Sequence, residues 1–393
     1  MCNPNKLFLL ATLVVTVTTG AVYGAETRDP AQNAALQYWM ATSLTPRISD
    51  EDNKTLFTEK PGEKLSEASR RYAGMTSSMP FVVRASKMPY CEWGLQRDGG
   101  PDLLMPHLSK MRFLGKMISS SLQLCVEDGK AGDGVPYIRG GLALGRFMGQ
   151  DDWLISYLVG QAIQELTIQK TAIFLPQLDK AALHELQIQL EQLPAQRPIS
   201  EVLLAEGKMF RNWMRKRIAA GSNLVEELRA LGATNDQLGN LTAEQFKNEV
   251  DSLEKFYQEA GAAINLPDSE SRQELAKLEV KVRNEGGPLC KLLIPTLLPM
   301  RDTEQRTQIH FLQLRAAIRV LLDGPEALAN CPDPVDGKPF TYSKTPTGFE
   351  LNSRAMDREK NVKLAIGFAW KSTPLETKVE PAPKKPVPPP ADF

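Results

Sequence analysis

The sequence predicts a mainly α-helical protein, a multi-helix bundle or an irregular helical array, that ends in a small three-stranded antiparallel β-meander. Three observations predict this class. Apolar residues recur every three or four positions in most segments between residues 33 and 323. The period changes to two between Phe340 and Trp370, which is the pattern of half-buried strands. Clusters of Gly and Pro separate the periodic segments, as expected for turns.

The N-terminal 24 residues have the features of a signal peptide. Lys6 provides a positive region, residues 7–17 are apolar, and Val22 and Gly24 are compact residues before a cleavage point. The apolar stretch of about ten residues is short of the roughly twenty that cross a bilayer, and an N-terminal membrane anchor is the alternative. We therefore expect a secreted or periplasmic protein with no integral membrane segment after signal removal.

Length and charge limit the domain organisation and the partners. The 393 residues carry 47 Lys and Arg against 47 Asp and Glu, and this balance disfavours nucleic acid as a partner. After the signal peptide (1–24) we expect a helical domain (25–300) and a helix plus β-meander unit (301–373). A Pro- and Lys-rich disordered tail (374–393) ends the chain, either as a solubilising segment or as a tether.

The helical periodicity begins near residue 33. Residues 33–44 predict a short helix whose apolar side carries Leu36, Trp39 and Met40. Further short helices are expected within residues 63–75 and 81–88. The stretch between Thr45 and Gly62 is polar and acidic, which indicates a surface loop.

Residues 101–193 predict the centre of the helical domain. One helical stripe is formed by Leu104, Leu108, Met111, Ile118, Leu122 and Cys125. Gly141, Gly145 and Gly149 are spaced four apart, which favours close packing of two helices. Asp151 or Asp152 is expected to cap the next helix, with a buried face formed by Ile155, Leu158, Ala162 and Leu166.

The second half of the helical region has clear start signals. A helix is expected from about Ile199 to Leu231, and a capping box at residues 242–245 starts another that reaches Ile264. Helices are also expected from residue 268 to the Gly286-Gly287 pair and from residue 302 to Gly324, with a short apolar helix at 289–298 between them.

The segment that carries the period of two resembles the C-terminal unit of a family of exported bacterial helical proteins. It contains the pattern D-P-x-x-G-K-P-x-x-Y from Asp333 to Tyr342 and G-F-x-L-x-S from Gly348 to Ser353. In that family a helix precedes these two motifs, and a last strand follows them. The unit is also similar to the C-terminal half of type II secretion pseudopilins.

Short motifs upstream are similar to the same exported family. They are Asn33-Ala34-Ala35 with Tyr38, Cys91-x-Trp93-Gly94, and Leu193-Pro194 followed by Glu206. A pseudopilin instead begins with an apolar helix directly after a prepilin cleavage site, whereas an ordinary signal and a large helical region precede the unit here. The resemblance implies no activity. Pseudopilins often bind calcium in this unit, but we expect Asp333 and Asp336 to stabilise a turn.

Four cysteines remain after signal removal: Cys91, Cys125, Cys290 and Cys331. An even number in an exported chain allows two disulfides, and the most local pairing joins Cys91 to Cys125 and Cys290 to Cys331. The alternative is that all four are reduced, buried side chains. Their spacing matches no zinc motif.

The sequence lacks the usual signatures of catalysis. The three histidines are far apart, and His184 has no second histidine at the spacing of a zinc-binding helix. No G-x-S-x-G motif and no phosphate-binding loop occurs in the sequence. We therefore predict no metal, no cofactor and no catalytic residue.

Glu206 is the polar residue that we single out, because it lies on the apolar face of its helix with Val202, Met209 and Trp213. A carboxyl in that position has a raised pKa unless an arginine pairs with it. With Trp213 and Trp93 it could line a ligand site. Alternatively it forms a buried ion pair, with partners among Arg139, Arg146, Arg211, Arg215 and Arg217.

These observations favour a non-catalytic structural or interaction role in the cell envelope, with an envelope protein or a cell-wall component as partner. A periplasmic protein that binds a small molecule or a glycan in an inter-helix cleft is the second hypothesis. A hydrolase that uses paired carboxylates is the third.

Overall fold

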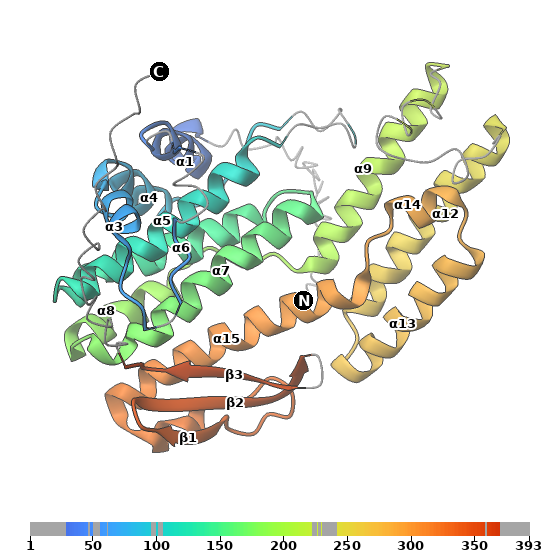
Figure 1. The fold of residues 1–393 in the computed structure, drawn as a ribbon. Helices are drawn as coiled ribbons and strands as arrows, with labels where there is room; N and C mark the ends of the chain where they lie inside the picture. Colours follow the sequence, from blue (N-terminus) through green and yellow to red (C-terminus); the bar gives the residue numbers. More distant parts are fainter. Residues whose placement is uncertain are drawn as a thin grey trace, which may run out of the picture.

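The computed structural model describes residues 29–45, 48–49, 56–60, 62–95, 100, 105–221, 226, 229, 242–357 and 360–369. Its architecture confirms the predicted class, because helices dominate and a three-stranded antiparallel sheet follows the last long helix (Figure 1). The predicted signal peptide and Pro-rich tail lie outside these residues. Within them, no helix has the length and apolar character that a bilayer crossing requires.

A larger group of helices, which we call the body, surrounds one hydrophobic core. Its helices are α1 (Ala34–Ser43), α3 (Glu67–Ala73), α4 (Met79–Ala85), α5 (His107–Glu127), α6 (Val135–Met148), α7 (Leu154–Phe174) and α8 (Lys180–Glu191). The second half of α15 (Leu297–Asp323) and the sheet complete the body, because Ile309, Leu314 and Leu351 belong to the same buried cluster.

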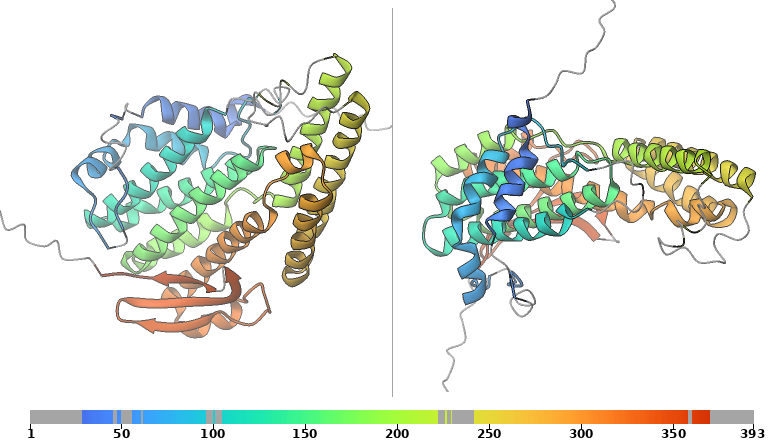
Figure 2. Two further views of the ribbon diagram at one scale, coloured as in Figure 1. Left: turned by 45° about the vertical axis from the view of Figure 1, so that its right-hand side comes forward. Right: turned by 90° about the horizontal axis from the view of Figure 1, so that it is seen from above.

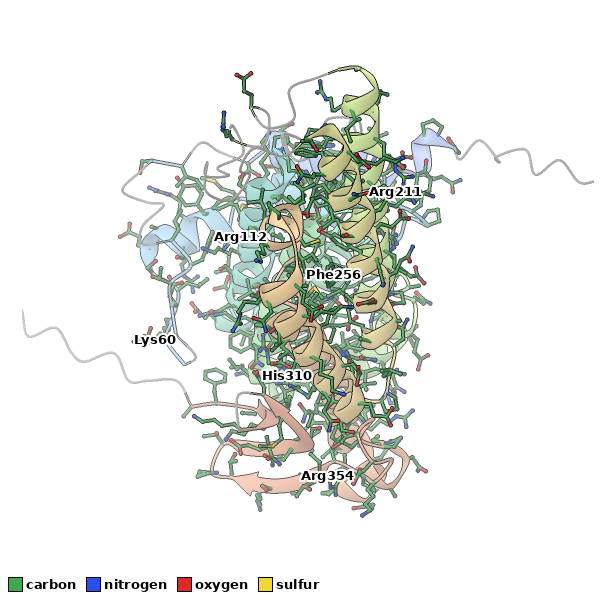
Figure 3. The ribbon with its side chains drawn as sticks, turned by 90° about the vertical axis from the view of Figure 1, so that its right-hand side faces the viewer. Lys60, Arg112, Arg211, Phe256, His310 and Arg354 are labelled. Carbon is green, nitrogen blue, oxygen red and sulfur yellow. The ribbon has the colours of Figure 1, made fainter. Side chains whose placement is uncertain are left out.

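A second group of helices, which we call the arm, extends from one side of the body (Figure 2). It consists of α9 (Ile199–Ala219), α12 (Ala243–Ile264), α13 (Asp268–Glu285) and α14 (Pro288–Leu293). The arm has its own buried cluster, to which Tyr157 of α7 and Met300 of α15 also contribute. In Figure 3 the labelled Arg211 and Phe256 lie on the arm, and Arg354 lies at the sheet. The body and the arm are therefore joined through α7 and α15.

The glycines of α6 bring α6 and α7 close together, as the spacing predicted. A Cβ atom on Gly145 would lie 2.6 Å from the carbonyl oxygen of Gly160 in α7 and would overlap Gln164. A Cβ on Gly141 would lie 3.0 Å from Cγ2 of Thr167. Only glycine permits this approach, because the space that a side chain needs is already filled by α7.

The predicted buried face of α7 is wrong. Ile155 and Ala162 are exposed, and about half of the buried positions are held by polar residues and glycine. The buried polar set comprises Ser156, Gln161, Gln164, Thr167 and Thr171. A search for apolar periodicity selects the opposite side of such a helix, since its buried side offers hydroxyls and amides.

The predicted cap of α7 is also wrong. The N-cap residue is Trp153, and the first free backbone N–H, that of Leu154, donates to Glu206 of α9. Asp151 instead accepts a hydrogen bond from Ser156 Oγ at 2.8 Å. A carboxylate from the arm thus replaces the local cap that the sequence suggested.

The sheet has the order β1 (Thr341–Thr345), β2 (Gly348–Asp357), β3 (Lys360–Ile366), all antiparallel. Leu351 pairs with Leu364, and the buried side chains of β2 and β3 alternate as predicted. Gln313 of α15 donates from Nε2 to the carbonyl oxygens of Leu351 and Val362 at 3.0 and 3.3 Å. The sheet is therefore fixed to the helix that covers it.

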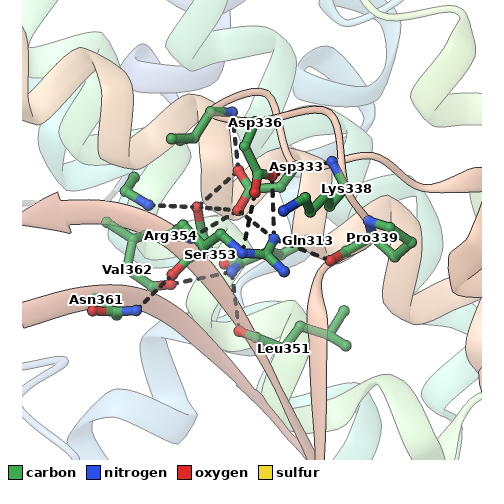
Figure 4. A network of polar contacts seen from close by, with 12 residues as sticks. Gln313, Asp333, Asp336, Lys338, Pro339, Leu351, Ser353, Arg354, Asn361 and Val362 are labelled. Carbon is green, nitrogen blue, oxygen red and sulfur yellow. Dashed lines mark hydrogen bonds and ion pairs between the residues drawn. The ribbon is translucent and has the colours of Figure 1, made fainter. Parts of the chain in front are cut away.

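Asp333 organises the turn that precedes β1 (Figure 4). Its buried carboxylate accepts hydrogen bonds from Ser353 Oγ at 2.9 Å, from the backbone N–H of Arg354 at 2.7 Å and from that of Val335 at 3.2 Å. Asp336 accepts from the N–H of Lys338. Both aspartates thus stabilise the turn, as predicted, and hold it against β2.

Of the two alternatives for the cysteines, the structure has the reduced one, since all four are free; Cys91, Cys290 and Cys331 are buried and Cys125 is partly buried. Trp93, two residues after Cys91, stacks on His107 at the start of α5, whereas Cys125 lies near the end of α5, about 27 Å along the helix axis. Cys290 belongs to the arm core and Cys331 to the body core. A disulfide needs Cα atoms only about 4.4–6.8 Å apart.

Candidate functional site

Glu206 is buried where the arm meets the start of α7. Its carboxyl accepts hydrogen bonds from the backbone N–H of Leu154 at 2.7 Å and from Tyr257 Oη at 3.3 Å. Burial raises its pKa to about 7, and the nearby carboxylate of Asp151 adds to the effect, against the lowering by these two donors. Its partners tie α7, α9 and α12 together.

The expected arginine partner of Glu206 is not found among the described residues. Arg211 pairs with Glu254, and Arg215 pairs with Asp251 at 2.8 Å, both across to α12. Arg139 donates to the carbonyl oxygen of Ser86 in the body. Glu206 is therefore a buried carboxyl held by a backbone amide and a phenol.

The two predicted tryptophans lie in different places. Trp93 packs in the body core against Tyr38 and His107, with ring centroids 5.8 and 5.1 Å apart. Trp213 belongs to the arm core and lines a groove of about 440 Å³ along α9 with Lys208. Trp93 and Trp213 thus belong to separate cores, so they do not form one aromatic site with Glu206.

A larger cleft lies where body and arm meet, with a volume of about 600 Å³. Its walls come from α6, α7, the segment 196–198, the start of α9, the end of α12 and α15. The polar and aromatic residues of its lining are Arg146, Tyr157, Gln161, Gln164, Gln196, Ser200, Asn265, Arg301, Glu304, Thr307, Gln308 and Phe311. This volume lies in the range of small-molecule sites.

Two helices supply most of these side chains because of their spacing. Tyr157, Gln161 and Gln164 are separated by four and three residues, so they share one face of α7. The same rule places the α15 residues from Arg301 to Phe311 that line the cleft on one face of that helix. Part of the polar face of α7, formed by Tyr157, Gln161 and Gln164, thus opens into the cleft.

Glu304 is bound on several sides. Its Oε1 accepts from Tyr157 Oη and from the backbone N–H of Ile199, each at 3.0 Å, and its Oε2 accepts from Arg301 Nη1 at 2.9 Å. The phenol pKa of Tyr157 is raised far above its ordinary value by burial and by the Glu304 charge. The Tyr157 hydroxyl therefore stays protonated and acts as a hydrogen-bond donor.

Arg146 has a different environment. Its guanidinium lies over the ring of Phe311, 4.7 Å from the centroid, and Nη1 donates to the carbonyl oxygen of Pro194 at 2.7 Å. Its Nε is buried with no hydrogen-bond partner in the structure, and no carboxylate of the described residues contacts the guanidinium. Burial and the charge of Arg315 lower its pKa to about 10, so it remains charged at neutral pH.

Side-chain amides contribute uncharged polar groups to the lining. Gln164 Nε2 donates to Gln196 Oε1 at 3.0 Å. Gln161 is only 2% exposed, and its amide makes no hydrogen bond with the described residues. The amide atoms of Gln161 are not fully buried, so they are available to a donor or an acceptor on a molecule bound in the cleft.

Sequence reasoning missed most of this cleft. Arg146 was considered only as a partner for Glu206, and the glutamines of α7 were not considered. The available signal was the run of amides and hydroxyls at helical spacing on α7, opposite its apolar stripe. In comparisons with known proteins, no family model, no curated protein and no solved structure matches the chain.

Proposed function

We propose that this protein is a non-enzymatic binding protein that holds a small polar molecule in the cleft between body and arm. The observation that carries the proposal is the cleft of about 600 Å³, in which the guanidinium of Arg146 has no acidic partner among the described residues and the amide of Gln161 makes no hydrogen bond with them. The predicted export would make this an extracytoplasmic binding function.

The arrangement of the carboxylates near the cleft favours a binding function over a catalytic one. A hydrolase of the kind that we considered needs two carboxyl groups that face the substrate. Among the described lining residues, Glu304 is the one carboxylate, and three donors already occupy it. Asp151 and Glu206 lie near each other, but both are buried and hydrogen-bonded to α7.

The test is a thermal-shift screen of the purified protein against small polar metabolites in four classes: neutral, anionic, cationic and zwitterionic. A ligand at 100 times its dissociation constant stabilises the folded protein by about 2.7 kcal/mol, which such a screen detects. We expect at least one compound to raise the melting temperature in a saturable way, with the binding confirmed by calorimetry.

Two variants locate the binding. Gln308 is exposed at the edge of the cleft, so Gln308→Trp should block the cleft without disturbing the core. The control is His184→Trp, which adds the same side chain at an exposed position of α8 outside the cleft. The proposal is overturned if no compound binds, or if Gln308→Trp binds as tightly as the unmodified protein.

An exposed row of apolar residues supports a second candidate function, an interaction with another envelope protein. Leu36, Met40 and Leu44, spaced four apart on α1 and its C-cap, are 47%, 48% and 46% exposed. The sequence predicted two of them, Leu36 and Met40, on the apolar side of the helix. The double change Leu36→Asp, Met40→Asp should abolish a specific cross-link to a partner in envelope extracts, whereas Ile188→Asp, at an exposed apolar residue of α8, should not.

A further inference from the structure

The charges that line the cleft do not cancel. The lining contains two arginines and one glutamate. Arg301 and Glu304 neutralise each other through their contact at 2.9 Å. Arg146 has only a carbonyl oxygen and an aromatic ring as partners, so the described part of the cleft carries one uncompensated positive charge.

The position of Arg146 suits one anionic group. The guanidinium is held by the Phe311 ring, over which its Cζ lies, and by the bond of Nη1 to Pro194. A planar guanidinium held in this way pairs well with a carboxylate, because both groups are flat and can form parallel hydrogen bonds. One negative charge balances Arg146, whereas a phosphate monoester would bring nearly two.

The neighbouring amides suit uncharged polar groups. Gln161 and Gln164 lie one turn apart on α7, and α6 and α7 are in close contact at Gly145, directly before Arg146. The residue without a charge partner and the amide without a hydrogen-bond partner thus line the same cleft. An amide group pairs with hydroxyls and with other amides, since it both donates and accepts.

From these contacts we infer that the ligand is a small carboxylic acid that also carries hydroxyl or amide groups, a sugar acid being the simplest example. Its carboxylate lies against Arg146, and its uncharged polar groups lie against Gln161. This inference rests on the proposed binding function and names its ligand class. An incoming carboxylate supplies the counter-charge that the described residues do not give to Arg146.

The experiment compares each acid that binds in the screen with its primary amide, which has almost the same size and hydrogen-bonding groups but no charge. D-glucuronate and D-glucuronamide are the first pair. Affinity is measured by calorimetry on the unmodified protein, on Arg146→Gln and on Arg315→Gln. Arg315 is exposed on α15 beside Arg146, so its variant controls for loss of a nearby positive charge outside the cleft.

We expect the amide to bind at least about tenfold more weakly than the acid, since its hydrogen bond to Arg146 no longer joins two opposite charges. Arg146→Gln should weaken the acid by a similar factor and remove the difference between acid and amide. Arg315→Gln should keep the affinity within about twofold.

The outcomes separate the two proposals. If neutral compounds bind in the cleft and acids do not, or if Arg146→Gln binds the acid as tightly as the unmodified protein, the ligand class is wrong and the binding function stands. If no compound of any class binds, the proposed function fails and the ligand class fails with it.

Discussion

The contact of α6 with α7 at Gly145 gives a sharp test of the packing that forms the cleft. Gly145→Ala adds one methyl group at a point where α7 leaves no space. The added Cβ would lie 2.6 Å from the carbonyl oxygen of Gly160 and 3.1 Å from the backbone nitrogen of Gln164. Both atoms belong to the backbone of α7, so no side-chain rotation can relieve the overlap.

Gly145→Ala costs free energy because α6 and α7 have to move apart to accommodate the added methyl group. Overpacking a close contact costs about 1–3 kcal/mol, and the better helix propensity of alanine returns about 0.5–1 kcal/mol. We therefore expect Gly145→Ala to lower the free energy of unfolding by about 1–2 kcal/mol.

The matched control is Gly132→Ala. A Cβ at Gly132 would meet only the Cβ of Ala182, at 3.7 Å, which is an ordinary contact. The control should be neutral or stabilising by up to about 1 kcal/mol, because alanine restricts the unfolded chain.

Urea unfolding followed by circular dichroism measures both variants. Gly145→Ala should unfold at a lower urea concentration than the unmodified protein, with the same dependence on urea. The reasoning about the contact between α6 and α7 is refuted if Gly145→Ala and Gly132→Ala have the same stability within about 0.5 kcal/mol.

Three further predictions concern charge, the turn and the thiols. Burial raises the pKa of Glu206 from 4.5 to about 7, so the folded protein holds this proton more tightly and loses stability as the pH rises from about 4.5 to 7. Between pH 5 and 8 the free energy of unfolding, measured in urea melts, should fall less for Glu206→Gln than for the unmodified protein, and the two decreases should differ by up to about 3 kcal/mol. Equal decreases would contradict the raised pKa of Glu206. Asp333→Ala leaves the buried hydroxyl of Ser353 without its acceptor, so it should lower the free energy of unfolding by about 3 kcal/mol and speed hydrogen exchange at the turn. The control is Asp336→Ala, at a carboxylate that is partly exposed, and it should cost less than about 1 kcal/mol. Because the four described cysteines are free, dithiothreitol should leave the melting temperature unchanged, and a large decrease would show that a disulfide had formed.

The predicted site depended on finding a polar residue on an apolar face, and this reasoning located a buried carboxyl but not the cleft. Glu206 is buried with a raised pKa, as its position suggested in the absence of an arginine. Its partners, Leu154 and Tyr257, are 52 and 51 residues away in the sequence, and no local pattern connects them. The cleft was missed because its α7 wall is a buried polar face.

The sequence by itself determined the fold class, the elements and the places where helices approach closely. These features depend on local preferences, on the spacing of apolar residues and on glycine, all of which act over a few residues. The alternation in β2 and β3 and the turn at Asp333 are of this kind.

The tertiary structure decided what depends on pairs of residues far apart in the chain. It placed Cys290 in the arm core and Cys331 in the body core, capped α7 with a carboxyl from the arm, and left Leu36 and Met40 of α1 exposed. It also gave Glu304 three donors and Arg146 no acidic partner among the described residues. The physical reason is that burial and charge compensation are set by neighbours in space, and the order of residues along the chain does not specify which neighbours meet.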